Sequence, residues 1–264
     1  MLSCLSMKRI SLRSEWSLGR KITGYLARID MAEIKLIGID ADDTLWQSET
    51  FFAEVEEKFL TLMGKYSSAN GLEKSLSTNE ITNLRVFGYG VKSFTLSMIE
   101  TAHLASNGEI SSADIKTIIS WGKELLQHPV VLLDGVQEAV EELSRDFTVF
   151  IVTKGDLLHQ RSKIEISGLD TFVAGFEIFH EKDPESYLDF LDEQGVEPQN
   201  FLMAGNSLRS DVLPVAAIGG HAVHIPYELT WDYEKVADGA VPKSGYAVVE
   251  KILDLPGFVR GLHG

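Results

Sequence analysis

The chain has 264 residues, 44% of them hydrophobic, and a formal net charge of -15. This length and apolar content allow a sizeable buried core, as one large domain or as a core with a smaller lobe. The negative charge argues against nucleic acid as a partner. The single cysteine, Cys4, excludes disulfides and thiolate metal sites in the folded region. Apolar runs stay well short of the ~18 residues that cross a bilayer, so we expect no membrane insertion and a cytoplasmic location.

Residues 1–30 differ from the rest in charge, with six basic residues against two acidic ones. Such a segment could be a transit-like peptide, because it is rich in arginine and poor in acids. Met31, however, begins a stretch typical of a natural start. We therefore interpret residues 1–30 as a disordered tail or an upstream-start artefact. The segment lacks the apolar stretch of a secretory signal, so secretion is not expected.

The first predicted strand is an apolar run that ends at Ile39 and is followed by Asp40-Ala41-Asp42-Asp43-Thr44. In a fully extended chain Asp40 and Asp42 would lie on one face about 7 Å apart, whereas a bend out of the strand can bring both to one reacting atom. Asp40 could then attack phosphorus as a carboxylate, and Asp42 could protonate the leaving oxygen and later take a proton from water. A solvated turn is the alternative, because aspartate is also typical of turns.

Residues 46–133 are predicted to be helical and to lie outside the alternation of strands and helices. Apolar spacing predicts helices over residues 49–65, 79–86, 93–105 and 111–126, separated by Gly/Asn pairs. Arg85, Tyr89 and Lys92 fall at i, i+4 and i+7, so one helical face could meet an anionic or ring-bearing substrate. A solvated basic face is the alternative, because two glycines, Gly88 and Gly90, weaken a helix there.

The chain is predicted to return to the core at residues 130–133, with a helix from Val136 to about Ser144. Three further apolar runs follow, over residues 147–152, 172–179 and 201–204. We expect a closing strand or helix within residues 244–254. The aromatic residues of segment 224–231 are expected to pack against the core, because such side chains bury large areas.

Each of these three apolar runs leads into groups that bind phosphate or metal. Thr153 and Lys154 precede a helix start, where a hydroxyl and free amides bind anions well. Lys182 precedes a helix that starts near Pro184, and this cation could neutralise a nucleophile and a phosphate. Gly205 to Asp211 is an oxygen-rich loop suited to a hard divalent cation. Ligands of open parallel sheets bind at the carboxyl ends of the strands, so we expect these groups to meet there.

With Asp40 to Thr44, Thr153, Lys182 and Gly205 to Asp211 in this order, the sequence resembles the haloacid dehalogenase superfamily of hydrolases. The resemblance covers residues 34–225. It implies an α/β fold with a doubly wound, mostly parallel Rossmann-like sheet, formed by residues 31–45 and 134–264. It also implies that residues 46–133 form an all-helical cap that closes over the site and excludes water.

The resemblance implies a role for each matched residue. Asp40 is the nucleophile and Asp42 the general acid/base. Thr153 and Lys182, with Lys154 beside them, hold the phosphate. Magnesium is the implied cofactor, bound by Asp40, by the backbone carbonyl of Asp42 and by acids of the fourth motif.

The chain departs from the family pattern in the fourth motif. The residue after Gly205 is usually aspartate, and here it is Asn206. The amide oxygen of Asn206 can ligate a metal or orient a water molecule, but it brings no charge. We therefore expect Asp211 to be the acidic ligand and the affinity for magnesium to be lower than usual.

The sequence thus predicts a magnesium-dependent phosphatase that acts on a small phosphorylated metabolite through an aspartyl phosphate. A phosphomutase or phosphotransferase using the same intermediate is one alternative. A catalytically weak phosphate-binding regulatory protein is another, motivated by Asn206. Asp42 disfavours a dehalogenase, because a halide leaving group needs no acid. Monomer and homodimer both remain open.

Overall fold

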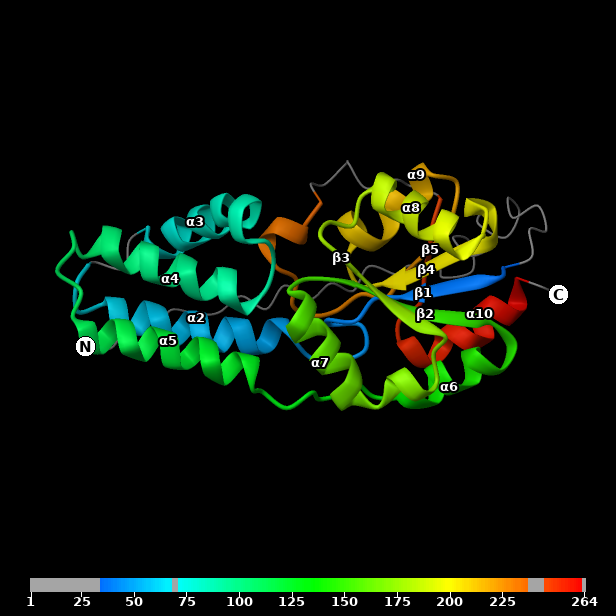
Figure 1. Cartoon of the computed structure of the whole chain (residues 1–264), viewed down its shortest axis with the longest axis horizontal. Helices are drawn as coiled ribbons and strands as arrows, with labels where there is room; N and C mark the ends of the chain where they lie inside the picture. Colours follow the sequence, from blue (N-terminus) through cyan, green and yellow to red (C-terminus); the bar gives the residue numbers. More distant parts are fainter. Residues whose placement is uncertain (1–33, 68–70, 237–244, 263–264) are drawn as a thin grey trace, which may run out of the picture.

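The computed structural model describes residues 34–67, 71–236 and 245–262 (Figure 1). The predicted tail, residues 1–30, lies outside this part of the chain. Six parallel strands form one sheet in the order β3-β2-β1-β4-β5-β6. The strands are β1 (Leu36–Ile39), β2 (Thr148–Lys154), β3 (Gly175–Phe179), β4 (Phe201–Gly205), β5 (His221–His224) and β6 (Ala247–Val248). The order reverses at β1, as in a doubly wound sheet, so the predicted fold class is confirmed.

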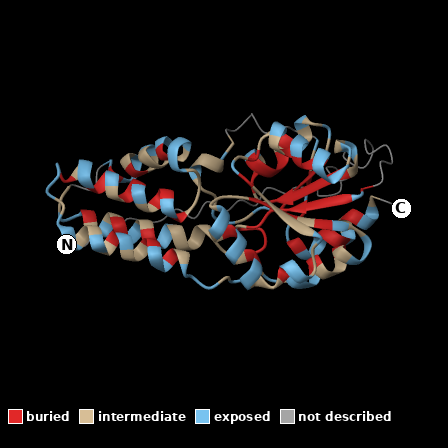
Figure 2. Cartoon of the chain, in the orientation of Figure 1, coloured by how far each residue is buried: buried red, intermediate tan, exposed pale blue. Residues whose placement is uncertain are grey.

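Helices cover both faces of the sheet, which explains why the central strands are continuous apolar runs. Every residue of β1 and β4 is buried (Figure 2). One face carries α6 (Val136–Asp146), α7 (Leu157–Ser167) and α10 (Leu255–Gly261), and the other carries α8 (Pro184–Gln194) and α9 (Leu213–Ala217) (Figure 1). Val140 and Ile164 pack in the first layer, and Tyr187 and Phe190 in the second.

Local sequence signals define where the helices after β2 and β3 begin. The Asp156 side chain accepts a hydrogen bond from the His159 backbone N–H and caps α7. The Asp183 side chain caps α8 in the same way, and Pro184 occupies the first turn, where its missing N–H costs nothing. These caps fix the turns that follow β2 and β3. Of the predicted phosphate-binding residues, Thr153 and Lys154 end β2, and Lys182 lies in the turn after β3.

The segment predicted as a cap contains four helices with a core of their own. They are α2 (Glu49–Met63), α3 (Leu72–Phe87), α4 (Val91–Ala105) and α5 (Ser112–Leu126). Phe59, Met98 and Ile118 are fully buried among them. Ser111 caps α5 by accepting a hydrogen bond from the Asp114 N–H. Figure 1 shows these helices side by side at one end of the molecule, away from the sheet.

Two details of the predicted elements are wrong. Helix α3 starts at Leu72, earlier than predicted. The predicted strand 172–179 begins only at Gly175, because a short turn of 3-10 helix precedes it. The predicted return to the core at residues 130–133 is confirmed, because Leu132 and Leu133 pack against the core and Leu132 forms a bridge with Trp46.

The single helical face proposed for Arg85, Tyr89 and Lys92 is also wrong. Helix α3 ends at Phe87, and α4 begins at Val91. Between them Gly88 and Gly90 have φ angles of 73° and 103°, a region that glycine enters without steric cost. The helical period is therefore lost between Arg85 and Lys92.

In the described residues, the helices fall short of the length and apolar character that crossing a membrane requires.

The tightest packing constraint on the central strand is at Gly38. A Cβ atom there would lie 2.8 Å from the Met203 sulfur and 2.9 Å from the Phe201 ring, both fully buried.

We expect Gly38→Ala to lower the free energy of unfolding by about 1–3 kcal/mol through overpacking. Urea denaturation measures this. Gly257→Ala in α10 is the control: its added Cβ meets nothing within 4 Å, so it should be neutral or stabilise by about 0.4–1 kcal/mol. Equal effects of the two substitutions would contradict this account.

Candidate active site

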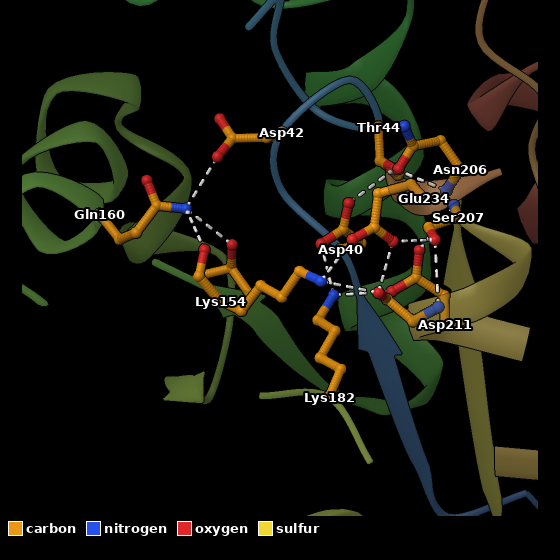
Figure 3. Close-up of polar contacts among 12 residues, drawn as sticks. Asp40, Asp42, Thr44, Lys154, Gln160, Lys182, Asn206, Ser207, Asp211 and Glu234 are labelled. Atoms are coloured by element: carbon orange, nitrogen blue, oxygen red, sulfur yellow. Dashed lines mark hydrogen bonds and ion pairs between the residues drawn. The ribbon is translucent and has the colours of Figure 1, made fainter. Parts of the chain in front are cut away.

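A buried lysine joins two carboxylates at the carboxyl edge of the sheet (Figure 3). Lys182 Nζ lies 2.5 Å from Asp40 Oδ1 and 2.7 Å from Asp211 Oδ1. Asp40 directly follows β1, Lys182 lies between β3 and α8, and Asp211 lies in the turn Leu208–Val212 after β4. The exposed fractions are 3% for Lys182 and 0% for Asp211. Three elements distant in the sequence therefore meet through one ion-pair chain.

The charges of Lys182, Asp40 and Asp211 depend on one another. Burial alone would lower the pKa of Lys182, but Asp211 and Asp40 outweigh it and raise that pKa, so the lysine stays protonated. Burial raises the pKa of Asp40 to about 7, while Lys182 opposes the shift and Asp211 adds to it. One cation thus serves two carboxylates. A second cation beside Asp40 would favour its ionised, nucleophilic form.

The loop after β4 packs directly against Asp40. The Asn206 backbone N–H donates to Thr44 Oγ1 at 3.0 Å, and this hydroxyl donates to Asp40 Oδ2 at 3.1 Å. A Cβ atom at position 205 would lie 2.3 Å from Asp211 Oδ2 and 2.8 Å from Asp40 Cβ. Only glycine at position 205 therefore lets β1 and the loop approach this closely.

Asp42 points away from Asp40, toward α7 (Figure 3). Its carboxylate accepts hydrogen bonds from Trp46 Nε1 at 2.8 Å, Gln160 Nε2 at 2.8 Å and Lys163 Nζ at 2.5 Å. Burial would raise the pKa of Asp42, but Lys163 and these hydrogen bonds lower it. In this arrangement Asp42 is a carboxylate ready to accept a proton. Donating one requires these contacts to loosen.

The last two residues of β2 lie in the same site. Thr153 is 1% exposed, and its hydroxyl accepts a hydrogen bond from Gln160 Nε2 at 2.8 Å. Lys154 Nζ lies 2.6 Å from Glu234 Oε1 and 2.8 Å from Ser210 Oγ. The sequence suggested that Lys154 is free to bind phosphate. In the structure its ammonium group is instead held by the Glu234 carboxylate.

Glu234 is a member of the site that sequence analysis missed. It accepts hydrogen bonds from Ser207 Oγ and Ser210 Oγ, both at 2.6 Å, as well as from Lys154. Burial would raise the pKa of Glu234, but Lys154 and the hydrogen bonds lower it. Glu234 follows the aromatic segment near residue 231, and no motif marks it. Gln160 and Lys163 were also missed, although their spacing of three on α7 places them on one face.

A cavity of about 200 Å³ opens above these groups. One side is lined by residues at the carboxyl edge of the sheet, among them Asp40, Asp42, Thr153 and Lys182. Residues of α2, α3 and α4 line the other side. Tyr89 lines the cavity, donates to Glu181 at 2.5 Å and lies under Lys154, whose Nζ is 4.2 Å from the ring centroid. Arg85 and Lys92 are exposed and are not among its lining residues; Lys92 instead pairs with Asp156 at 2.7 Å.

Trp231 corrects the prediction that segment 224–231 packs against the core. The Trp231 ring lies edge-on to the ring of Tyr89, with their centroids 6.4 Å apart. Tyr89 belongs to the turn that joins α3 and α4. The Trp231 side chain also lies close enough to Glu80 on α3 to oppose the rise in the pKa of that carboxyl. Trp231 lines the cavity, so this segment closes the cavity against the helical bundle.

The oxygen donors at this edge fit magnesium in kind. Among the residues that the structure describes, Asp40 Oδ2 accepts a hydrogen bond from Thr44 alone, and the Asn206 amide oxygen lies 3.4 Å from the same hydroxyl. Both oxygens of Asp211 already accept hydrogen bonds, from Lys182 and from the Ser207 N–H. Within the described residues, no three His, Cys, Asp or Glu side chains gather closely enough to hold a metal ion. Asp211 is therefore a weaker candidate for a direct ligand than the sequence suggested, and Asp40 and Asn206 are stronger ones.

Residues 34–219 match the sequence model of the haloacid dehalogenase-like hydrolases. The chain belongs to this family. A solved haloacid dehalogenase-like hydrolase from Xanthomonas campestris is 40% identical, with a TM-score of 0.79 over 89% of this chain and 94% of that one. The hydrolase YfnB of Bacillus subtilis, at 16% identity and a TM-score of 0.60 over 86% of this chain and 99% of that one, shares the fold.

N-acylneuraminate-9-phosphatase of Mus musculus is 34% identical over 97 residues, which are 35% of this chain and 39% of that protein. The Homo sapiens protein of the same name is 32% identical over an equal span. The match thus spans about two fifths of the length of these curated relatives.

The Glu80 carboxyl gives the site a pH-dependent effect on stability. Burial, with repulsion from Glu56 and Glu49, raises the pKa of Glu80 from 4.5 to about 8. Between these values the folded chain holds a proton that the unfolded chain releases, so this group costs stability as the pH rises. We therefore expect Glu80→Gln to gain stability relative to wild type between pH 5 and pH 8. Urea denaturation across this range measures the gain.

The control for this prediction is Glu57→Gln, which changes an exposed glutamate on α2. Its difference from wild type should stay flat over the same pH range. Parallel curves for Glu80→Gln and wild type would show that Glu80 is ionised in the folded chain at pH 5.

Proposed function

We propose that the protein is a phosphatase that hydrolyses a small phosphate monoester through a phosphorylated Asp40. The observation that carries the proposal is the buried chain Asp40-Lys182-Asp211 at the floor of a cavity that also contains Thr153. A carboxylate held by a buried cation at the carboxyl end of a central strand is positioned to attack phosphorus. The similarity to N-acylneuraminate-9-phosphatase over 97 residues supports phosphate esters as the substrate class.

The proposed reaction has two steps. A carboxylate oxygen of Asp40 attacks phosphorus, the ester P–O bond breaks, and the leaving oxygen takes a proton from Asp42. Water then attacks the phosphorus of the acyl phosphate, Asp42 takes the proton, and the bond to Asp40 breaks to release phosphate. Lys182 and Thr153 bind the phosphoryl oxygens. The donors from α7 hold Asp42 as the carboxylate that the second step requires.

Magnesium is the proposed cofactor. Asp40, the backbone carbonyl of Asp42 and the Asn206 amide oxygen would hold it, with Asp211 behind them. When bound, it supplies positive charge that neutralises the phosphoryl group and the nucleophile. Asn206 lowers the negative charge of this donor set, so we propose a modest affinity for the ion.

Product analysis tests the proposal against its alternatives. The enzyme with magnesium is incubated with a panel of phosphorylated sugars, nucleotides and small acids, including N-acylneuraminate 9-phosphate. A phosphatase releases one inorganic phosphate per substrate consumed. A mutase or phosphotransferase consumes substrate and keeps the phosphoryl group esterified, and a regulatory phosphate-binding protein binds ligand without turnover. Either of the last two outcomes would refute the phosphatase.

Replacing the nucleophile tests the covalent mechanism. We expect Asp40→Asn to abolish phosphate release while leaving the fold intact, because the amide is isosteric but is not a competent nucleophile. Phosphate release is measured together with circular dichroism, and mass spectrometry verifies that the amide has not deamidated. Wild-type-like release by the verified variant would rule out attack by Asp40.

Replacing Asp42 tests proton transfer. We expect Asp42→Asn to slow turnover by about 10² to 10⁴, the usual range for loss of a general acid/base. The loss should be smaller for p-nitrophenyl phosphate, whose leaving group needs little protonation, than for an alkyl phosphate. Steady-state kcat values for the two substrates give the comparison. An equal loss on both would assign Asp42 to positioning rather than to protonation of the leaving group.

Restoring a carboxylate in the fourth motif tests the metal site. We expect Asn206→Asp to tighten magnesium binding, because a second negative charge lies close to the ion. Calorimetric titration and the magnesium-induced rise in melting temperature both report this affinity without turnover. Asn107→Asp is the control, since it adds the same charge at an exposed turn between α4 and α5. An equal response of the two variants would remove Asn206 from the proposed metal site.

A further inference from the structure

The wall of the cavity that faces away from the catalytic edge is acidic. Glu49 and Glu56 lie seven residues apart on α2, two turns along one helical face, with Phe52 between them on the same face. Glu80 on α3 lines the cavity beside them. Three carboxylates from two helices of the bundle therefore surround the space where the rest of a substrate would lie.

No lysine that lines the cavity is free to neutralise these glutamates. Lys154 pairs with Glu234, Lys163 with Asp42, and Lys182 with Asp40 and Asp211. Among residues 34–67, 71–236 and 245–262, no ion pair reaches the three glutamates of the far wall. The cavity lysines thus lie at the phosphate site, each paired with a carboxylate, whereas the glutamates of the far wall have no cationic partner among these residues.

The far wall keeps these acids at a cost in free energy. Burial raises the pKa of Glu49 to about 7, and Glu56 and Asp42 add to the shift. Burial and Glu56 act in the same direction on Glu80. The raised pKa values mean that Glu49 and Glu80 are partly or largely protonated near neutral pH when no cation is present. A positive group that entered the cavity would lower these pKa values and favour the ionised carboxylates that bind it.

Two further residues of the far wall, Ser93 and Trp231, are placed to contact a ligand. Ser93 on α4 lines the cavity and is only 3% exposed, and across the described part of the chain its hydroxyl has no hydrogen-bond partner. A buried polar group without a partner is uncommon in a folded protein. Trp231 also lines the cavity, and its side chain lies close enough to Glu80 to oppose the rise in the pKa of that carboxyl.

We propose that the substrate is a small phosphate monoester that carries a protonated amine, bound by Glu49, Glu56 and Glu80 beside the Trp231 ring. This inference rests on the phosphatase function proposed above. Carboxylates with an adjacent aromatic face bind ammonium groups through charge-assisted hydrogen bonds and cation–π contact. The Ser93 hydroxyl provides a neighbouring polar contact. The phosphate occupies the opposite end, at Lys182 and Thr153.

The size and charge of the cavity narrow the class further. Its volume of about 200 Å³ is below the roughly 300–1,000 Å³ of pockets for drug-sized ligands. A substrate with a second acidic group would place that group against the glutamates, where like charges repel. We therefore assign small amino-alkyl or amino-sugar phosphates to this site and exclude phosphorylated carboxylic acids.

Matched substrates test this assignment, because they differ at a single group. O-phosphoethanolamine, 2-hydroxyethyl phosphate and 2-phosphoglycolate carry an ammonium, a hydroxyl and a carboxylate, respectively, at equivalent positions. Glucosamine 6-phosphate, glucose 6-phosphate and N-acetylglucosamine 6-phosphate form a larger series. In at least one series, we expect kcat/KM for the amine to exceed that for the hydroxyl by about 10- to 100-fold, with the carboxylate lowest in the first series.

Adjacent glutamates on α2 provide matched variants. Glu56 lines the cavity, whereas Glu57 is exposed. Glu56→Gln should reduce the advantage of the amine over the hydroxyl by about tenfold, mainly through KM, and Glu57→Gln should leave it unchanged. p-Nitrophenyl phosphate, which carries no amine, is the reference substrate, and Glu57→Gln should hydrolyse it at the wild-type rate. A loss of amine preference in Glu56→Gln that exceeds its change on p-nitrophenyl phosphate identifies a specificity residue rather than damage to the fold.

The failure of this inference is distinguishable from failure of the proposed function. If p-nitrophenyl phosphate is hydrolysed and the amines show no advantage in either series, the phosphatase stands and the amine assignment is wrong. Equal kcat/KM values for the hydroxyl and the amine would indicate a polyol phosphate as the substrate class in place of an amine-bearing phosphate. If no phosphate ester in any series is hydrolysed, the proposed function itself fails.

Discussion

The buried contact of Lys182 with Asp40 and Asp211 is the constraint on which the rest of the site depends. A fully buried cation is stable only when its partners are held in good geometry, and removing one partner leaves an uncompensated charge. The contact joins the ends of β1 and β4 to the turn before α8. Gly205 is required for the same reason, because any side chain there would separate the two carboxylates. The packing of the sheet and the placement of the nucleophile are thus one arrangement.

The features predicted correctly from the sequence are those that short segments determine. Apolar runs buried on both faces identified the central strands, and the predicted helix start near Pro184 matches α8. The rule that parallel strands present their carboxyl ends at one edge was enough to bring Asp40 and Lys182 together. The structure adds the distances and the shared partner, Asp211.

The features that sequence analysis missed depend on contacts between distant segments. Asp42 is turned by donors on α7, more than a hundred residues away, and nothing near Asp42 indicates them. Glu234 reaches the site from an irregular segment that no periodicity marks. The error at Arg85 and Lys92 has a local cause: an i, i+4, i+7 pattern assumes a continuous helix, and glycines at positive φ interrupt it.

The loop Asp40 to Thr44 also connects the carboxyl edge of the sheet to α2 through hydrogen bonds. The Asp43 carboxylate accepts hydrogen bonds from the Ser48 and Glu49 N–H groups at 2.9 and 3.1 Å, and so caps α2 where the Ser48 side chain does not. Asp43 tolerates its φ of 61° because aspartate enters this region more readily than most residues. The loop that holds Asp40 is therefore tied to the helix that carries Glu49 and Glu56. A shift of α2 would act directly on the loop of Asp40 and Asp42, so under the proposed function a substrate bound at the acidic wall would be coupled to the position of these two carboxylates.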